Sequence, residues 1–291
     1  MATRRDVLGA GLSTGAGLLI AGCAGAGPIP DTFSEFEAVR AQIGGRLGIC
    51  VIDTASGHRI SFDARSRYAM CSTFKLPLVG AVLAAVDRGE LALDRLVQFA
   101  DADILEYAPI VGKARDHALS VEQLCAAAVT LSDNSAANLL LPLIGGPAGL
   151  TAFARGQGDA VFRLDRTEPT LNANIPGDPR DTTTPTAMAK LTVKLLTGRT
   201  LSPASRARLI GWMVASPTGA KRLRAGLPSA WKAGDKTGTS GQGAVNDVAI
   251  AWPTGRAPIV IVCFADAPGA AAEALEGAHR SVARLVATRF G

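Results

Sequence analysis

The sequence predicts a two-lobed α/β fold in which both ends of the chain build one antiparallel sheet and the middle forms a helical lobe. Residues 46–53 and 58–62 have the β-branched content and the intervening turn of a strand hairpin. Three more strand-like segments, separated by Gly- and Pro-rich turns, lie near the end of the chain. Because two strand groups can pair across an inserted helical segment, we assign residues 31–66 and 213–291 to an α/β lobe and residues 67–212 to an all-α lobe.

The composition is that of a globular chain with a sizeable core. Of the 291 residues, 48% are hydrophobic, 19% are charged and 5% are aromatic, which excludes a disordered or coiled-coil protein. The formal net charge is +5, and the Lys and Arg residues that carry it are scattered. The sequence therefore predicts no nucleic-acid partner.

The helical elements are predicted from their periodicity and their start signals. A short helix is expected over residues 33–42, and a final helix over residues 270–290. Three helix starts in the middle of the chain carry a capping side chain: Ser120 with Gln123 three residues later, Thr184 before Pro185, and Ser202 before Pro203. These starts place several helices in the inserted lobe, and a cleft between the lobes is the expected ligand site.

The first residues have the pattern of an export signal. Arg4 and Arg5 precede an apolar run over residues 8–20, which is too short to span a bilayer. The paired arginines resemble a twin-arginine export signal. We therefore predict a signal peptide over residues 1–22 and an exported bacterial protein, located in the periplasm or the cell envelope.

The end of this signal has two interpretations. The stretch "LIAGC" resembles the box at which bacterial lipoproteins are cleaved, with lipidation of the Cys23 thiol. Residues 23–30 would then form a tether, and a lipid anchor would be the contact with the membrane. The alternative is ordinary signal cleavage near residues 24–26, which gives a free protein.

Four cysteines follow this segment, and none has the spacing of a metal site. They are Cys50, Cys71, Cys125 and Cys263. The chain has no C-x-x-C pair and only three histidines, so neither a metal nor an organic cofactor is predicted. We expect each cysteine to behave as a small buried hydrophobic residue.

A hydroxyl and an amine stand three residues apart at the start of a predicted apolar helix. Ser72 and Lys75 would share one face of that helix. A serine hydroxyl becomes a good nucleophile when a base takes its proton, and burial would lower the pKa of the lysine toward that role. Such a pair arises by chance about once in a chain of this size. Pro77 predicts a loosened or kinked first turn, because it cannot donate to the carbonyl of Thr73.

Two further triplets add to this pair. Residues 132–134 read "SDN" on a short link between two helices, and residues 236–238 read "KTG" in a strand-rich segment. A second serine and a second lysine can pass a proton and offset an anionic substrate group. Gly238 would let a ligand lie close to the strand backbone. The three motifs in this order are the signature of class A β-lactamases and penicillin-binding proteins.

The chain resembles the class A serine β-lactamases over most of its mature length, residues 33–290. Supporting stretches include "EYAPIVGK", "TLSDNSAANLLL", "LDRTEPTLN", "DPRDTTTP" and "AGDKTGTS". The resemblance implies a five-stranded antiparallel sheet flanked by helices, plus an all-helical lobe. It also implies a monomeric enzyme that confers antibiotic resistance by hydrolysing the β-lactam amide of penicillins and cephalosporins.

The resemblance implies a set of catalytic roles. The residues concerned are Ser72, Lys75, Ser132, Glu168, Asn172 and Lys236. Ser72 attacks the lactam carbonyl, and either Lys75, or Glu168 through water, takes its proton; this choice stays open. Ser132 passes a proton to the departing lactam nitrogen. Glu168 and Asn172 then direct water at the resulting ester.

Other positions are implied to bind substrate or to hold the catalytic loop. The substrate-binding residues are Tyr107, Asn134, Arg222, Thr237, Gly238, Thr239 and Ser240. The backbone N–H groups of Ser72 and Thr239 would hold the oxyanion. Arg166 and Asp181 resemble the ion pair that closes this loop, and the peptide bond before Pro169 is expected to be cis.

Arg222 is implied to bind the substrate carboxylate. Many family members bind this carboxylate with an arginine on the strand after the KTG strand, where this chain has Val245. Arg222 instead matches an alternative arginine found in a subset of the family that includes carbapenem-hydrolysing enzymes. Glu276 would orient the Arg222 side chain. The alternative interpretation of Arg222 is an arginine on the protein surface without a role in the site. In that subset Cys71 forms a disulfide, but Ser240 stands at the partner position, so we expect a free thiol.

Two other functions share this serine chemistry. One is a cell-wall DD-peptidase, and the other is a penicillin-binding sensor that stays acylated. Acylation alone gives a dead-end complex, whereas a base beside the ester gives turnover. Glu168 and Asn172 therefore favour an enzyme that turns over β-lactam antibiotics.

Overall fold

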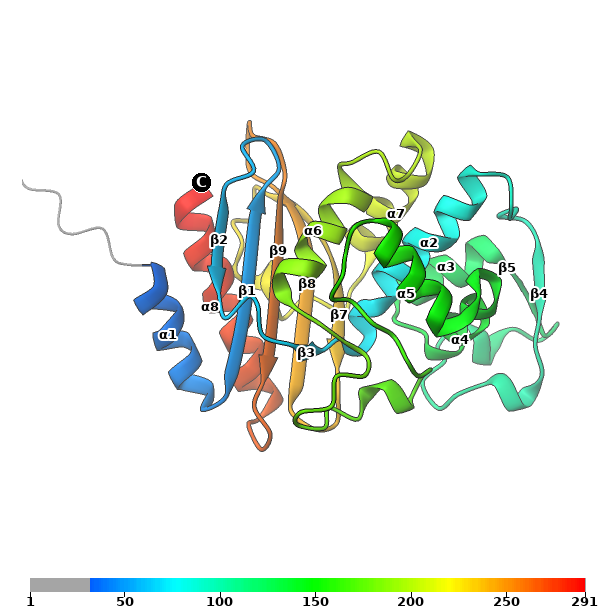
Figure 1. The fold of residues 1–291 in the computed structure, drawn as a ribbon, viewed down its shortest axis with the longest axis horizontal. Helices are drawn as coiled ribbons and strands as arrows, with labels where there is room; N and C mark the ends of the chain where they lie inside the picture. The colour runs from blue at the N-terminus through cyan, green and yellow to red at the C-terminus, as the bar shows by residue number, and fades with distance from the viewer. Residues whose placement is uncertain (1–31, 291) are drawn as a thin grey trace, which may run out of the picture. The chain divides into compact units, whose positions relative to one another are not determined.

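The computed structural model describes residues 32–290, which group into one compact unit. The predicted signal peptide, the tether and the lipidation site at Cys23 lie outside the described residues. Within this part of the chain, both ends contribute strands to one central sheet, as Figure 1 shows.

The central sheet has five antiparallel strands, as predicted. They are β1 (Arg46–Asp53), β2 (Arg59–Phe62), β7 (Lys232–Thr239), β8 (Ala244–Trp252) and β9 (Ile259–Asp266). Their order across the sheet is β2-β1-β9-β8-β7. β1 pairs with β9 from Arg46 opposite Asp266 to Asp53 opposite Ile259, so the N-terminal hairpin joins the C-terminal strands. This order leaves β7 at the edge that borders the helical lobe.

Turn chemistry and side-chain alternation explain these strands. β8 and β9 are joined by a tight turn in which the Arg256 N–H donates to the Pro253 carbonyl oxygen at 3.1 Å. Along β8, Val248 and Ile250 face the core shared with the helical lobe, whereas Ala249 between them faces the opposite core. Both faces of the sheet are therefore apolar, and each must be shielded from water by helices packed against it.

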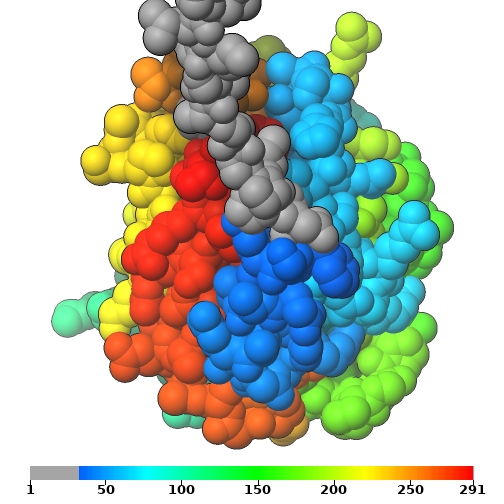
Figure 2. Space-filling view, turned by 90° about the vertical axis from the view of Figure 1, so that its left-hand side faces the viewer, coloured from blue at the N-terminus to red at the C-terminus, as the bar shows by residue number. Residues whose placement is uncertain are grey.

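Two helices from the ends of the described chain cover one face of the sheet. They are α1 (Thr32–Ile43) and α8 (Ala272–Phe290), and Figure 2 shows them side by side on this face. Phe36 of α1 and Val282 of α8 are buried in the same hydrophobic cluster. Burial of a side chain of this size contributes about 1.5–3 kcal/mol.

Six helices lie on the other side of the sheet (Figure 1). They are α2 (Lys75–Asp87), α3 (Val121–Thr130), α4 (Asn134–Leu140), α5 (Gly146–Gly156), α6 (Pro185–Leu196) and α7 (Pro203–Ala215). As predicted, Ser120, Thr184 and Ser202 cap α3, α6 and α7 by accepting a backbone N–H. Among the described helices none alone is long and apolar enough to cross a membrane; residues 134–144 and 146–156 meet that test only jointly, across a 70° bend.

The inserted lobe differs from the predicted all-α unit. It contains two short strand pairs, β3 (Tyr68–Ala69) with β6 (Thr182–Thr183) and β4 (Leu96–Gln98) with β5 (Ala118–Ser120). Its hydrophobic core also continues onto the sheet, where it includes Phe264 of β9. The described residues form one compact unit, and the lobe boundaries after residues 66 and 212 stay a prediction. Strands of two or three residues are too short to show alternation in a sequence.

The start of α2 accommodates a proline without loss of a helical hydrogen bond. Cys71–Phe74 form a 3-10 turn, η1, and the α-helix begins at Lys75. Pro77 is thus in the first turn, where a backbone N–H has no helical partner. The turn before Pro77 departs from α geometry. We predicted a loosened or kinked turn, whereas the 3-10 turn is wound more tightly than an α-helix. The other 3-10 turns are η2 (Asp101–Asp103), η3 (Val111–Lys113), η4 (Leu141–Ile144), η5 (Thr170–Asn172) and η6 (Leu223–Gly226).

Candidate active site

A cleft of about 310 Å³ lies where the start of α2 meets the edge strand β7. It is lined by Ser72, Tyr107, Ser132, Asn134, Asn172, Thr218, Arg222, Thr237, Gly238 and Thr239. All of these except Thr218 are residues that the sequence predicts for the site. Nine predicted residues therefore line one cleft, and they come from the 3-10 turn η1 before α2, the α3–α4 link and the start of α4, β7 and the segments between these elements.

Ser72 is presented by an unusual backbone and a close strand contact. Cys71, just before it, has a φ of 47°, in the left-handed region. A Cβ on Gly238 would lie 2.7 Å from the Met70 carbonyl oxygen and 3.1 Å from the Ser72 nitrogen. Gly238 thus makes room for the chain's own backbone, whereas the sequence suggested room for a ligand. The Ser72 N–H is thereby held beside the strand that carries Thr239.

Lys75 is fully buried beneath Ser72. Its Nζ donates to Ser72 Oγ at 2.9 Å, to the Ser132 carbonyl oxygen at 2.8 Å and to Asn134 Oδ1 at 2.6 Å. Glu168 Oε1 lies 2.9 Å from the same nitrogen. Burial lowers the pKa of Lys75, and the Glu168 carboxylate acts in the opposite direction.

Ser72 Oγ contacts both of the bases that the sequence left as alternatives. It accepts a hydrogen bond from Lys75 and donates one to Glu168 Oε1 at 3.0 Å. Because a hydroxyl carries one hydrogen, a charged Lys75 leaves the Ser72 proton directed at Glu168. A neutral Lys75 could take that proton instead. The arrangement can activate Ser72 by either route, and the protonation state of Lys75 selects between them.

Ser132 connects two buried amines. Its backbone has a φ of 59°, and the neighbouring Asp133 caps α4. Lys236 Nζ donates to Ser132 Oγ at 2.9 Å and to the Thr237 carbonyl oxygen at 2.7 Å, while Lys75 Nζ lies 3.4 Å from the same hydroxyl. Burial lowers the pKa of Lys236 well below its usual range, and the charge of Lys75 adds to this effect. A hydroxyl between two such amines can relay a proton.

Glu168 is fixed at both its backbone and its carboxylate. Asn138 of α4 donates to the Glu168 carbonyl oxygen at 2.9 Å and accepts the Glu168 N–H at 3.0 Å. Asn172 Nδ2 donates to Glu168 Oε2 at 2.6 Å. Asn172 Oδ1 is buried and has no hydrogen-bond partner among the described residues. An unused buried acceptor beside a carboxylate is a suitable place for a water molecule.

Glu168 belongs to a loop over residues 165–181, which we call the Glu168 loop. As predicted, an ion pair joins its two ends. Arg166 Nε donates to Asp181 Oδ2 at 2.5 Å. Asp181 Oδ1 accepts two backbone N–H groups from the other end of the loop, at 2.7 and 2.9 Å. The peptide bond before Pro169 is cis, also as predicted.

Arg222 is only 7% exposed, so the interpretation as a surface arginine is wrong. Its Nη1 donates to the carbonyl oxygens of Gly238 at 3.0 Å and Asn246 at 2.7 Å. Its Nη2 donates to Thr239 Oγ1 at 2.7 Å. Glu276 of α8 lies 4.0 Å from Nε, in the place predicted for an orienting carboxylate. Arg222 therefore fixes the edge of β7 and presents its charge to the cleft.

Ser240 is placed differently from the prediction. It was expected to bind substrate, but it does not line the cleft. Its Oγ accepts the backbone N–H groups of Gln242 and Ala244, both at 3.1 Å, within the β7–β8 turn. Serine hydroxyls in turns often bond to nearby backbone in this way, which a motif match does not reveal.

The cysteines of the described chain are all free, as expected for buried thiols. Burial raises the pKa of Cys71 and of Cys125, so both thiols stay protonated and unreactive. Within residues 32–290, no group of three or more His, Cys, Asp or Glu side chains is placed to hold a metal ion.

Comparison with known proteins decides the family. A family model described as the β-lactamase enzyme family matches residues 32–290. The chain belongs to this family. β-Lactamase CTX-M-8 of Citrobacter amalonaticus is 43% identical over 256 residues, which cover 88% of this chain and 88% of that protein.

Solved structures of the β-lactamase family also match the fold. An ancestral (GNCA) class A β-lactamase superposes with a TM-score of 0.87 at 52% identity, covering 88% of this chain and 99% of that one. A β-lactamase from Xanthomonas campestris pv. campestris gives a TM-score of 0.87 at 47% identity, covering 89% and 97% respectively. The predicted fold class is therefore confirmed.

Three residues of this β-lactamase-family site were not predicted. Asn138 lies four residues after Asn134 on α4, so the shared helix face was a signal that could have found it. Thr218 lines the cleft and accepts the Thr237 hydroxyl at 2.8 Å, but it lies in a loop without a sequence pattern. Asn174 is the third, and it belongs to the Glu168 loop.

Asn174 ties the Glu168 loop to the central sheet. Its Nδ2 donates to the Gln242 carbonyl oxygen in the β7–β8 turn at 3.0 Å and to Asp266 Oδ1 at the end of β9 at 2.9 Å. Its φ of 45° lies in the left-handed region, which asparagine tolerates better than most residues. The amide therefore anchors the far side of the loop that carries Glu168 and Asn172.

Replacement of Asn174 should loosen this loop. We expect Asn174→Gly, which keeps the backbone conformation but removes both hydrogen bonds, to lower the free energy of unfolding by about 1 kcal/mol. Asn174→Ala should lower it further, because alanine is strained at positive φ. Hydrogen exchange of residues 165–181 should quicken in both variants while α8 is unaffected. Unchanged exchange of this loop in Asn174→Gly would show that the tie is not stabilising.

Proposed function

We propose that this protein hydrolyses the β-lactam amide of penicillins and cephalosporins and thereby confers antibiotic resistance. Its family membership supports the reaction class. The single observation that carries the proposal is the position of Ser72 Oγ, which is hydrogen-bonded to Lys75 at 2.9 Å and to Glu168 at 3.0 Å. A hydroxyl held between an amine and a carboxylate is prepared to lose its proton.

Acylation begins when Ser72 Oγ attacks the lactam carbonyl carbon. The Ser72 proton passes to Glu168 or to a neutral Lys75, and a tetrahedral oxyanion forms. The backbone N–H groups of Ser72 and Thr239 would hold that oxyanion, a role worth about 10²–10³ in rate per donor. The close approach of Gly238 to the Ser72 backbone supports this pairing of donors.

Collapse of the oxyanion breaks the carbon–nitrogen bond of the lactam ring. The departing nitrogen needs a proton, and Ser132 Oγ can supply it. Lys236 and Lys75 can restore the Ser132 proton, since their amines lie 2.9 and 3.4 Å from that hydroxyl. Where Glu168 took the Ser72 proton, it can pass that proton on to Lys75, 2.9 Å away, and become a carboxylate again. The product of this stage is an ester between Ser72 and the opened ring.

Deacylation requires water beside that ester. Glu168 Oε2 accepts from Asn172, and the buried Asn172 Oδ1 has no protein partner among the described residues. A water bound to both groups would be deprotonated by Glu168 and would attack the ester carbonyl. Collapse of this second tetrahedral intermediate breaks the ester bond, and Glu168 returns the proton to Ser72 Oγ, which lies 3.0 Å from its carboxylate in the free protein. Free Ser72 and the hydrolysed antibiotic result. This step separates a turnover enzyme from a DD-peptidase or an acylated sensor.

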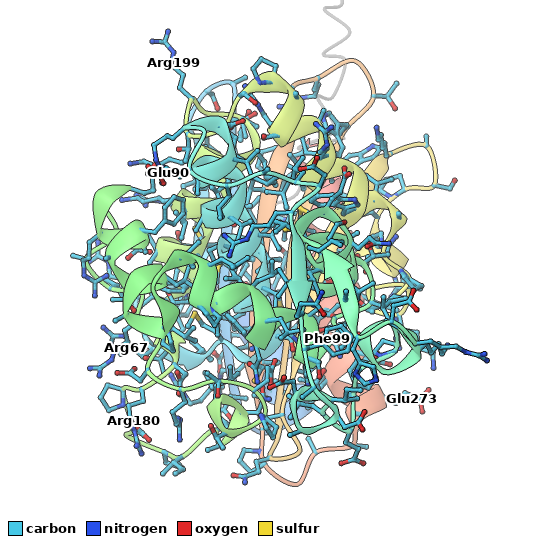
Figure 3. All side chains as sticks on the ribbon, turned by 90° about the vertical axis from the view of Figure 1, so that its right-hand side faces the viewer. Arg67, Glu90, Phe99, Arg180, Arg199 and Glu273 are labelled. Carbon is cyan, nitrogen blue, oxygen red and sulfur yellow. The ribbon has the colours of Figure 1, made fainter. Side chains whose placement is uncertain are left out.

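The Glu168→Ala variant tests the proposal. With a chromogenic cephalosporin, the native protein should turn over many equivalents, whereas Glu168→Ala should give a burst of about one equivalent and then stall, because the deacylating base is gone. Intact mass spectrometry should show the acyl adduct on the stalled variant. Glu273→Ala, on an exposed glutamate of α8 (Figure 3), serves as the matched control and should turn over normally. If the native protein is labelled stoichiometrically and does not turn over the cephalosporin, the enzyme proposal is wrong and a penicillin-binding sensor that stays acylated is favoured.

The same variant tests whether Lys75 can act as the acylation base. Burial lowers the pKa of Lys75 below 10.5, and the Glu168 carboxylate raises it, so its removal should lower this pKa further. Because only the neutral amine accepts a proton, the burst rate of Glu168→Ala should increase with pH and reach a plateau below pH 10.5. Stopped-flow measurement of the burst from pH 5 upward gives the profile. A burst rate that does not change with pH would exclude Lys75 from this role.

We further propose that the protein is exported, carries a signal peptide over residues 1–22, and acts as a monomer in the periplasm or cell envelope. The paired Arg4 and Arg5 before a short apolar run support export, and "LIAGC" supports lipidation at Cys23. Mass spectrometry of the native N-terminus should find acylated Cys23 as the first residue. An unmodified N-terminus downstream of Cys23 would replace the lipid anchor with ordinary signal cleavage.

A further inference from the structure

A second cavity borders the Glu168 loop and shares none of its lining residues with the cleft. Its volume is about 390 Å³. Its walls come from the loop, from the start of β1, from β3 and β6, and from the end of β9. Four arginines line it, Arg46, Arg67, Arg166 and Arg180, together with two carboxylates, Asp178 and Asp266. None of these residues has a place in the proposed hydrolysis as a group that touches substrate.

The charges around this cavity do not cancel. Arg180 forms a two-pronged pair with Asp178, in which its Nε and Nη2 donate at 3.0 and 2.7 Å. Arg46 lies 3.4 Å from Asp266, so it is weakly paired. Arg67 donates only to uncharged oxygens, at Thr182 and Val161. The four lining arginines carry +4, and the two lining aspartates together with Asp181, which binds Arg166 next to the cavity, carry −3, so the net charge is 4 − 3 = +1.

Arg67 is the centre of this excess charge. Burial of part of the side chain and the neighbouring Arg163 and Arg155 guanidiniums lower its pKa, whereas the Asp159 and Asp165 carboxylates act in the opposite direction. Its own hydrogen bonds hold the guanidinium between β6 and the segment before the Glu168 loop. A fixed cation without a carboxylate partner is one that an external anion would stabilise.

Arg166 adds unused donors. Its Nε binds Asp181, but its Nη2 lies 3.9 Å from Asp178, beyond hydrogen-bond distance. Neither Nη1 nor Nη2 has a hydrogen-bond partner among the described residues, although the side chain is only 20% exposed. Guanidinium groups with free N–H pairs match the oxygens of phosphate and carboxylate groups.

We propose that this cavity binds a small oxyanion, either a phosphate or a compact carboxylate-bearing molecule. Arg67 supplies the uncompensated charge, and Arg166 supplies free N–H groups from the loop side. Arg67 is exposed, as are Arg46 and Arg180, whose side chains are 48% and 50% exposed, so an anion can reach these guanidiniums from solvent. A bound anion would join the Glu168 loop to the strands that line the cavity with it and would restrain the loop.

Binding of inorganic phosphate and of citrate to the full chain tests this site. The unfolding temperature is followed as each anion is added while sodium chloride keeps the ionic strength constant, and calorimetry gives the stoichiometry. We expect saturable stabilisation with one anion per chain, and the tighter of the two probes identifies the preferred oxyanion. A response no larger than that to chloride would overturn the proposal, because it would be general screening.

The anion affinities of three variants test whether the bound anion lies in this cavity. Arg67→Gln should weaken binding by about tenfold or more, the effect of one charge-assisted hydrogen bond. Arg199→Gln is the matched control and should leave the affinity unchanged, since Figure 3 shows Arg199 at the top of the molecule and Arg67 and Arg180 in its lower half. Asp178→Asn should strengthen binding, because it removes a negative charge from the lining and frees Arg180.

Arg67→Gln should weaken anion binding and Asp178→Asn should strengthen it, so a folding defect cannot explain both results. A variant that merely damages the fold would lower the unfolding temperature without anion, but it would not strengthen binding as Asp178→Asn should. Equal affinities for Arg67→Gln, Asp178→Asn and the native chain would overturn the proposal even if anions stabilise the protein. β-Lactam turnover by these variants is a separate measurement, so this site can fail while the proposed function stands.

Discussion

The burial of the Lys75 amine is the constraint on which the rest of the site depends. An ammonium group without solvent must be surrounded by acceptors, and five oxygen atoms lie within 3.4 Å of this nitrogen. They belong to Ser72, Ser132, Asn134 and Glu168, which come from three separate parts of the chain. Removal of one partner from a buried ion pair typically costs about 3–5 kcal/mol, so the fold and the chemistry share these contacts. The same burial lowers the pKa of the amine that handles protons.

The helix that carries Lys75 makes this burial possible. α2 is apolar around its whole circumference and packs against most other helices of the inserted lobe. Its first residue is the lysine, and a 3-10 turn before it presents Ser72 to the edge strand β7. Gly80 lets α2 and α6 approach closely, since a Cβ there would lie 2.8 Å from Leu195. A tightly packed central helix thus holds the nucleophile at a fixed distance from the sheet.

The Glu168 loop brings the second reactive group to the same point and is held from several sides. Arg166 and Asp181 close its neck, Asn138 binds the Glu168 backbone from α4, and Asn174 binds the sheet. The cavity that borders the loop is lined by arginines that exceed the carboxylates in number. These polar contacts can be changed one at a time, because a neutral hydrogen bond contributes only about 1 kcal/mol and one to a charged group about 1.5–3 kcal/mol. The geometry of deacylation therefore rests on a set of replaceable side chains.

The sequence by itself determined the strand groups, the capped helices and the order of the reactive motifs, because these follow from local spacing and composition. The spacing of Ser72 and Lys75 marked them as a candidate pair, whereas Ser132, Glu168 and Lys236 received their roles from the resemblance to class A β-lactamases. All five converge as expected. Only the tertiary structure decided what each polar atom meets. It placed Ser240 in a turn, joined the two lobes through one core, and brought Asn174 to Asp266 across 92 positions of sequence. Hydrogen bonds are directional and short in range, so their partners are set by packing between distant elements, which no local pattern records.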